Sequence, residues 1–266
     1  MAVSASALSD ALTRAVGRDF LKDDPETISR HAVDGVPPRW VAFPGGSQEV
    51  SDLVKVASEE RLAITPWGSG TRVGLGNIPT RVDLVLNLSR LSRVVEHTPD
   101  DLTVTVEAGT SLLTLSSHLS RHRQFLPLDP LDGPARTLGG VTATDSSGPL
   151  RIRYGTTRDL LLGVRFIQAD GAVTWGGAKV VKSVTGYDMP KLMVGALGSL
   201  GVLVELTLRL HPLPDAERSW LCRFHSADRA GEFIQRLLDS SLQPNRLQFL
   251  NGEALRAMDH GGEGTV

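Results

Sequence analysis

A glycine-rich segment is the part of the chain whose residue types and spacing best suit binding chemistry. It reads Pro66-Trp67-Gly68-Ser69-Gly70-Thr71-Arg72-Val73-Gly74-Leu75-Gly76-Asn77. Four glycines in nine positions allow backbone conformations that other residues avoid, so several N–H groups can point at one anion. The hydroxyls of Ser69 and Thr71 add further donors. The segment therefore suits a diphosphate, although a plain surface loop is an equally good interpretation of these residues alone.

Two familiar phosphate-binding motifs do not match this segment. A Walker A loop requires Lys-Ser/Thr after its last glycine, and a Rossmann fingerprint requires glycine where Val73 stands. Other parts of the chain must therefore decide what the segment does.

Two more stretches are rich in small residues. Pro127-Leu128-Asp129-Pro130 leads into residues 136–148, where glycine, alanine, serine and threonine dominate. Such residues leave room for a large flat ligand against the backbone, and tight packing between elements is the alternative. A third run, residues 195–202, again places glycines before a strand.

Alternating and helical patterns indicate the elements that position these stretches. Residues 40–43 and 62–65 are predicted strands on either side of a helix that begins at Ser47, which is a β-α-β unit. Further strands are expected at 83–88, 102–107, 160–169 and 204–210, and a helix is expected from Ser111. Leu8, Leu12 and Val16 predict an amphipathic helix that ends at Gly17. The expected fold class is α+β, or α/β.

A break near residue 214 separates two parts of the chain. Pro212 and Pro214 interrupt the last strand pattern, because proline cannot donate to a ladder. Beyond it, strands at 218–224 and 246–250 are expected around a helix from Ser226, a unit too small to bury a core alone. We therefore expect an N-terminal helical segment over 1–36, a large domain over 37–214 with subdomains 37–95 and 96–214, and the start of a truncated second domain over 215–266.

Composition excludes several classes of function. The 266 residues carry 28 basic and 30 acidic side chains, so the basic excess of a nucleic-acid-binding protein is missing. The single cysteine, Cys222, cannot form an internal disulfide or hold an iron–sulfur cluster, and its apolar neighbours suggest a core or edge position. No export signal is predicted, because residues 1–17 lack a charged start followed by an apolar run. No transmembrane segment is predicted either, since the most apolar stretch, residues 192–204, has 13 residues and a bilayer crossing needs about 20. We expect a cytoplasmic protein and leave open peripheral association with the inner face of the membrane.

The three glycine-rich stretches, in this order, resemble the FAD-binding domain of the vanillyl-alcohol oxidase and p-cresol methylhydroxylase (PCMH) flavoprotein family. Residues 106–110 (VEAGT) and 153–171 (RYGTTRDLLLGVRFIQADG) also match the family's pattern. The resemblance covers about residues 37–214 and implies a PCMH-type domain of two subdomains, followed by the start of an α+β cap domain.

The resemblance also implies which residues bind FAD. In the family the first loop binds the pyrophosphate, the second stretch passes the pyrophosphate and isoalloxazine, and the last run lies nearby. The positions that match are Pro66, Trp67, Gly68, Ser69, Gly70, Thr71, Arg72, Gly76, Pro130, Thr137, Gly139, Gly140, Ala143, Thr144, Ser147, Gly148, Gly198, Gly201 and Val202.

Within the family, residues 176–214 are most similar to the FAD-binding subunits of glycolate oxidases, through the Lys182-Ser-Val-Thr-Gly-Tyr-Asp188 core. This likeness implies an FAD-dependent subunit of a 2-hydroxy-acid dehydrogenase complex. Its partners would be a catalytic flavoprotein subunit and an iron–sulfur subunit, and its substrate a small 2-hydroxy acid.

Departures from the family pattern limit these expectations. Thr71 stands where many members carry a histidine that bonds the flavin, so FAD should be held noncovalently. Trp67 replaces a frequent arginine and Leu197 a frequent glutamate, and no His-x-Gly-Asp-Gly motif for metal and substrate occurs. No catalytic base can be named. The alternatives are a noncatalytic scaffold or truncated remnant that binds FAD weakly or not at all, and a stand-alone flavin oxidoreductase acting on another alcohol.

Three other groups of residues receive structural interpretations. His118 and His122 have the spacing of a metal pair, but Leu119 stands where a zinc protease has glutamate, so we interpret them as solvated and predict no metal site. Tyr187 and Asp188 are expected to fix a turn. Three arginines, at positions 151, 153 and 158, are expected to form a solvated charged edge.

Overall fold

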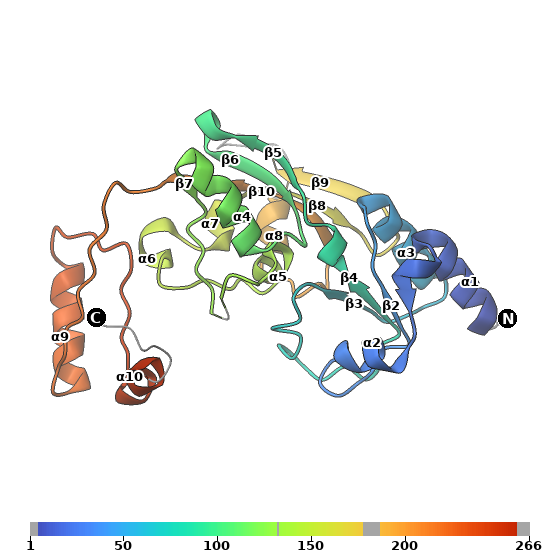
Figure 1. Cartoon of the computed structure of the whole chain (residues 1–266), viewed down its shortest axis with the longest axis horizontal. Coiled ribbons are helices and arrows are strands. Elements are labelled where there is room, and N and C mark those ends of the chain that lie inside the picture. The colour runs from blue at the N-terminus through green and yellow to red at the C-terminus, as the bar shows by residue number, and fades with distance from the viewer. Residues whose placement is uncertain (1–4, 132, 178–186, 260–266) are drawn as a thin grey trace.

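The computed structural model describes residues 5–131, 133–177 and 187–259 (Figure 1). Two sheets with helices packed on them make up most of the chain, and a helical arm follows at the C-terminal end. The mixed α+β class expected from the sequence is confirmed.

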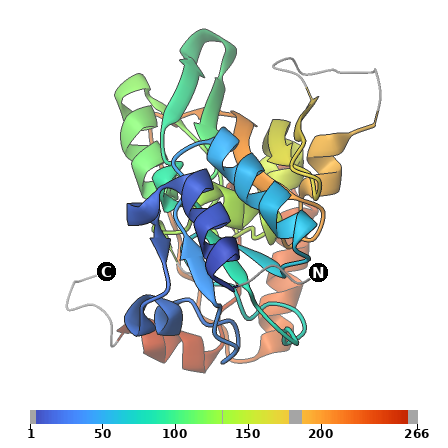
Figure 2. The same ribbon diagram turned by 90° about the vertical axis from the view of Figure 1, so that its right-hand side faces the viewer.

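The first sheet is small and mostly parallel. Its order is β1 (Leu21–Lys22), β2 (Trp40–Ala42), β4 (Leu84–Asn87) and β3 (Ile64–Trp67). The last three strands are parallel and β1 is antiparallel to β2. Helices α1 (Ala5–Val16) and α3 (Ser47–Glu59) lie side by side on one face, as Figure 2 shows, while α2 (Pro25–Arg30) lies toward the other. The predicted β-α-β unit and N-terminal helix are thus confirmed.

The apolar faces of α1 and α3 are the buried ones. In α1, Leu8, Leu12 and Val16 are buried, and Gly17 ends the helix with a φ of 85°. In α3, the residues that face the sheet are Val50, Leu53, Val54 and Ala57. This cluster supplies the core of the first sheet.

The second sheet is antiparallel throughout. Its order is β5 (Val94–Thr98), β6 (Thr103–Glu107), β10 (Val202–Arg209), β8 (Leu161–Ile167) and β9 (Val173–Gly177). On one face of this sheet a second hydrophobic core forms, and it includes side chains of α4 (Leu112–Leu119), α5 (Leu138–Ala143) and α8 (Met189–Met193). The strand predicted for residues 204–210 is confirmed as part of β10. Its buried leucines alternate with less buried residues, except that Thr207 is also buried and its hydroxyl pairs with that of Thr105 at 3.0 Å.

Short elements connect and complete these layers. Strand β7 (Gln124–Phe125) pairs with β11 (His211–Pro212). The remaining helices and turns are α6 (Arg151–Tyr154), α7 (Thr157–Leu160), η1 (Arg18–Phe20), η2 (Leu88–Arg90), η3 (Pro99–Asp101) and η4 (Ser120–His122). No helix in these described residues combines the length and apolar character that a bilayer crossing requires.

The C-terminal arm differs from the expectation. Helix α9 (Ala227–Leu238) begins after Ser226, whose hydroxyl accepts from the Arg229 N–H, but residues 218–224 and 246–250 form no strands. A further helix, α10 (Gly252–Asp259), was not predicted. The strand predictions were wrong because no neighbouring strand supplies backbone partners there, and a strand without a ladder is not stable in water.

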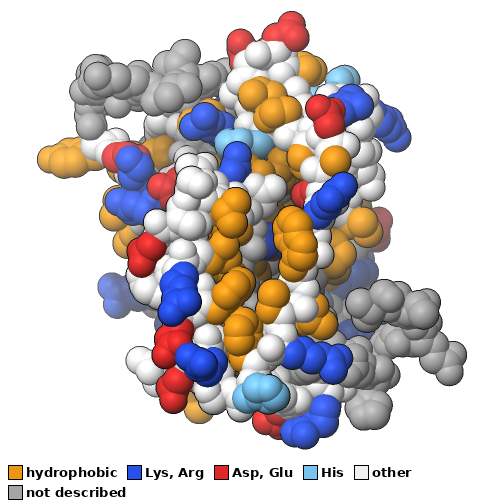
Figure 3. Space-filling model, turned by 90° about the vertical axis from the view of Figure 1, so that its left-hand side faces the viewer, with side chains coloured by type: hydrophobic (Ala, Val, Ile, Leu, Met, Phe, Trp, Pro, Cys, Tyr) orange, Lys and Arg blue, Asp and Glu red, His pale blue; other side chains and the backbone are white. Residues whose placement is uncertain are grey.

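Apolar side chains on this arm stay in contact with solvent. Trp220 is 81% exposed, and Leu221, Phe224 and Phe249 are also exposed. Figure 3 shows hydrophobic side chains gathered on the face of the molecule that the arm occupies. Cys222 is exposed too, which corrects its predicted core or edge position.

Candidate functional site

The glycine-rich loop begins one residue after β3. The ladder pairs Ile64 with Leu84 and Trp67 with Asn87, so the strand runs two residues beyond its predicted end and includes Pro66 and Trp67. The loop proper begins at Gly68. Gly70 has a φ of 78°, a left-handed conformation that favours glycine, and the ring of Trp67 lies where a side chain on Gly70 would project.

Backbone donors of this loop remain available to a ligand. Within the described part of the chain, the N–H groups of Ser69, Gly70 and Thr71 donate no hydrogen bond to protein atoms. The Ser69 and Thr71 hydroxyls lie 3.4 Å apart on the same turn. Donors grouped in this way are the arrangement that binds phosphate oxygens.

The second small-residue stretch packs directly on this loop. Thr137 caps α5 and lies against Gly68, where a methyl group would collide with its hydroxyl. The Gly139 N–H donates to the Ala108 carbonyl at 2.7 Å, and a side chain at Gly139 would meet Ala108. Glycine is thus required at both positions by close packing between segments far apart in the sequence.

The third glycine run joins the other two. The Gly195 N–H donates to Thr142 O at 3.0 Å and the Leu197 N–H donates to Ala143 O at 2.9 Å, which ties the run to α5. Gly198, with a φ of 75°, faces the Pro66 ring. The structure therefore brings all three stretches to one place, between the two sheets.

A cavity of about 280 Å³ opens where the three stretches meet. Two arginines, Arg72 and Arg136, contribute to its lining, and none of the described lining residues is acidic. Small residues and apolar side chains such as Leu88, Leu197 and Leu203 form the rest. The cavity is lined by two arginines, apolar side chains and backbone donors, and it suits an anionic ligand with a flat apolar part.

Arg136 is a charged lining residue that sequence reasoning missed. It is only 2% exposed, and its guanidinium donates to Thr144 Oγ1 at 3.0 Å and to the Leu131 carbonyl at 3.4 Å. A buried cation beside a cavity favours anions there, because little water screens its charge. The available signal was an arginine within a run of otherwise small residues.

Most of the predicted FAD-binding positions line this cavity. They are Pro66, Trp67, Gly68, Ser69, Gly70, Thr71, Arg72, Thr137, Gly139, Gly140, Ala143, Thr144, Gly198 and Gly201.

Five predicted positions lie outside its lining: Gly76, Pro130, Ser147, Gly148 and Val202. Gly76 is in the exposed part of the loop. Val202 is the first residue of β10, and its side chain is part of the core shared with α1 and α3. Pro130 is buried. Gly148 lies against the Asp129 carbonyl, where no side chain would fit. The hydroxyl of Ser147 is buried and has no hydrogen-bond partner among the described atoms.

The glycolate oxidase-like signature is only partly described. Residues 182–186 lie outside the described ranges. Asp188 caps α8 by accepting from the Lys191 N–H at 3.2 Å, whereas Tyr187 is 94% exposed. Bonding to Lys191 lowers the pKa of Asp188. Arg151, Arg153 and Arg158 are exposed, as expected of a charged edge.

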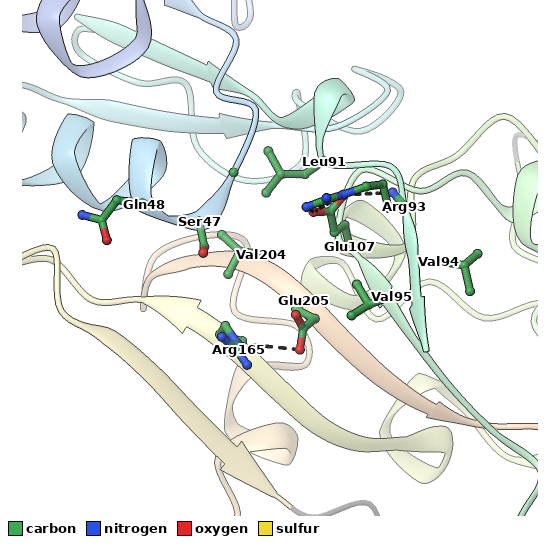
Figure 4. Close-up of a pocket in the computed structure, with 11 residues that line it drawn as sticks. Ser47, Gln48, Leu91, Arg93, Val94, Val95, Glu107, Arg165, Val204 and Glu205 are labelled. Atoms are coloured by element: carbon green, nitrogen blue, oxygen red, sulfur yellow. Dashed lines mark hydrogen bonds and ion pairs between the residues drawn. The ribbon is translucent and has the colours of Figure 1, made fainter. Parts of the chain in front are cut away.

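A second cavity, of about 460 Å³, lies between the first turn of α3 and the other face of the second sheet (Figure 4). Arg93 pairs with Glu107 at 2.7 Å and Arg165 lies 3.6 Å from Glu205, so both arginines in its lining face a carboxylate. These pairs neutralise one another, and we assign no ligand to this cavity.

Comparison with known proteins places the chain in a class. Residues 38–177, more than half of the chain, match the family described as FAD binding domain. The chain belongs to this family of FAD-dependent oxidoreductases, and FAD is the cofactor of the family's site.

Individual relatives narrow the class. The chain is 31% identical to the mitochondrial D-lactate dehydrogenase [cytochrome] of Arabidopsis thaliana, over 95% of its own length and 44% of the relative's. It is 31% identical to the glycolate oxidase subunit GlcD of Bacillus subtilis, over 84% of this chain and 47% of the relative. A D-2-hydroxyglutarate dehydrogenase of Xanthomonas citri is 31% identical over 82% of this chain and 47% of the relative. The chain thus spans about half the length of these relatives, and its type is that of GlcD and the D-lactate dehydrogenases.

Solved structures share the fold. An alkyldihydroxyacetonephosphate synthase superposes with a TM-score of 0.78 at 21% identity, covering 92% of this chain and 47% of that one. A 4-ethylphenol oxidase from Gulosibacter chungangensis superposes with a TM-score of 0.66, also at 21% identity, and the match covers 80% of this chain and 44% of that one.

Proposed function

We propose that this chain binds FAD noncovalently and is the flavin-carrying part of a dehydrogenase for small 2-hydroxy acids of the glycolate oxidase type. The observation that carries the proposal is the cavity between the sheets, with its backbone donors, two arginines and no acidic residue among the described lining.

The residues fit the pyrophosphate of FAD. Ser69, Gly70 and Thr71 offer backbone and hydroxyl donors on one turn, and Arg72 and Arg136 oppose the two negative charges. The described lining holds no histidine, cysteine or tyrosine to bond a flavin, which supports noncovalent binding.

The names of the relatives support the substrate class. D-lactate, glycolate and D-2-hydroxyglutarate all carry a hydroxyl on the carbon next to a carboxylate. Bound FAD would supply the acceptor for the hydride from that carbon. The hydroxyl proton needs a base, and the described lining of the cavity holds no histidine, lysine, tyrosine or carboxylate that could accept it. We therefore propose that a catalytic flavoprotein subunit completes the reaction, and that an iron–sulfur subunit takes the electrons onward.

The visible absorption spectrum of the purified chain, before and after acid precipitation, tests this proposal. Flavin bands that pass into the supernatant are the expected result, because they report noncovalent FAD. Bleaching of the bands by glycolate or D-lactate, with the partner subunits added under anaerobic conditions, would then support the substrate class. A protein that stays colourless after incubation with FAD would contradict the proposal and favour a scaffold.

A further inference from the structure

Three histidines converge beside the β5–β6 hairpin, away from the cavity. His97 lies on β5, His118 on α4 and His122 in η4, and one ring nitrogen of each lies within 4.8 Å of the other two. Figure 1 shows α4 next to this hairpin. The sequence pattern identified only His118 and His122, because residues 94–98 were not predicted as a strand. Packing supplies the third member.

Hydrogen bonds fix the orientation of the His97 ring. The buried Gln124 donates from Nε2 to the Pro99 carbonyl at 2.8 Å, which turns its Oε1 toward His97. That oxygen lies 2.9 Å from His97 Nε2 and can only accept, so Nε2 carries the hydrogen. The lone pair of His97 Nδ1 then points at His118 Nε2, 3.1 Å away.

This arrangement has the features of a metal site. Two nitrogens bound to one tetrahedral Zn²⁺ lie about 3.3 Å apart, close to the separation of the His97 and His118 nitrogens. Metal-binding histidines usually donate their other ring N–H to an oxygen, as His97 does to Gln124.

We propose that His97, His118 and His122 bind one divalent transition-metal ion, with the fourth coordination position open to solvent beside the exposed His122. Imidazole ligands suit Zn²⁺, Cu²⁺ or Ni²⁺. None of the three side chains lines the cavity between the sheets, so the ion would join the hairpin to α4 and η4 without contacting the flavin site. This proposal does not depend on the proposed function.

Zinc binding by untagged, EDTA-treated protein tests the proposal. Isothermal titration with Zn²⁺ should give one ion per chain, and Co²⁺ should give the visible absorption of a four-coordinate site. His122→Gln changes an exposed side chain, so it should fold normally and bind Zn²⁺ at least about tenfold more weakly. Gln124→Leu removes the oxygen behind His97 and should weaken binding by about 10–100-fold.

His225→Gln is the matched control, because His225 is exposed and outside the cluster. It should bind Zn²⁺ like the unmodified chain. Equal affinities for the unmodified, His122→Gln and His225→Gln proteins, or the absence of a one-to-one zinc complex, would overturn the proposal. In that case the His97–His118 contact would be an ordinary hydrogen bond. Flavin absorbance recorded with and without Zn²⁺ should be the same.

Discussion

At the scale of single residues, two glycines in the loop after β3 have similar backbone conformations but different relations to the cavity. Gly70 and Gly76 both have positive φ angles, 78° and 121°, but only Gly70 lines the cavity. Alanine at Gly70 would strain the backbone and meet the Trp67 ring, and so displace the donors of Ser69 and Thr71. We expect Gly70→Ala to raise the Kd for FAD about tenfold or more, a loss of about 1.4 kcal/mol.

Gly76→Ala is the control for this prediction, because it also strains a backbone of positive φ, but nothing lies within 4 Å of the added methyl group and the residue is outside the cavity. Its Kd for FAD, measured by flavin fluorescence titration, should change less than about twofold. If both variants lose affinity equally, the loop binds through its overall conformation and not through the donors near Gly70.

His211 makes stability depend on pH at a single residue. Burial, and then the charges of Arg209 and Arg153, lower its pKa, while Tyr154 and Phe125 cover its ring. A histidine with a lowered pKa binds a proton more readily when the chain is unfolded. The free energy of unfolding therefore decreases as the pH falls below about 6.5, the pKa of an unperturbed histidine. Urea unfolding from pH 7.5 to 5.5 should show a shallower loss for His211→Gln than for His225→Gln. Identical slopes would contradict the assignment.

At the scale of elements, the pairing of α3 with the first sheet illustrates how an amphipathic pattern becomes a core. Leu53 is fully buried beside Leu12 and Leu84. Leu53→Ala leaves a cavity there, and we expect the free energy of unfolding to fall by about 2–5 kcal/mol. Ser58→Ala, on the exposed side of the same helix, should change it by less than about 0.5 kcal/mol. Urea denaturation measures both values, and a loss below about 1 kcal/mol for Leu53→Ala would mean that the site collapses around the smaller side chain.

The elements also differ in how strongly their own residues specify them. Helix α4 begins at its Ser111 cap, which accepts from the Thr114 N–H at 3.0 Å, so local chemistry is sufficient to predict it. Strand β5 has half-exposed and exposed residues, and pairing with β6 alone defines it. Residues 218–224 have a similar apolar composition to a strand but no partner, and they remain irregular.

At the scale of the whole molecule, the arm after residue 214 is held mainly by polar contacts. Arg123 pairs with Asp215 at 2.7 Å, Arg246 lies 3.4 Å from Asp129, and Arg153 donates to the Gln243 carbonyl at 3.3 Å. Exposed ion pairs contribute about 0–1 kcal/mol each. We therefore propose that residues 1–214 form the FAD-binding unit independently of the arm.

Removal of residues 215–266 tests this division. We expect the Tm to shift by no more than about 4 °C and FAD affinity to be retained, because neither core cluster of the two sheets contains a residue of the arm. Calorimetry of the shortened and full chains makes the comparison. A large drop in Tm, or loss of cooperative unfolding, would show that the arm belongs to the same folding unit.

The sequence by itself determined the local features of this protein. Apolar spacing in α1, α3 and β10 specified their buried faces, and glycine spacing marked the three stretches that line the cavity, because periodicity and backbone freedom are properties of neighbouring residues. Tertiary structure decided the rest. The positions of Arg136 in the cavity wall and of His97 beside α4 depend on contacts between distant segments, as does the packing of Gly68 on Thr137. No local pattern encodes such contacts, since they form only when the two sheets and their helices pack together.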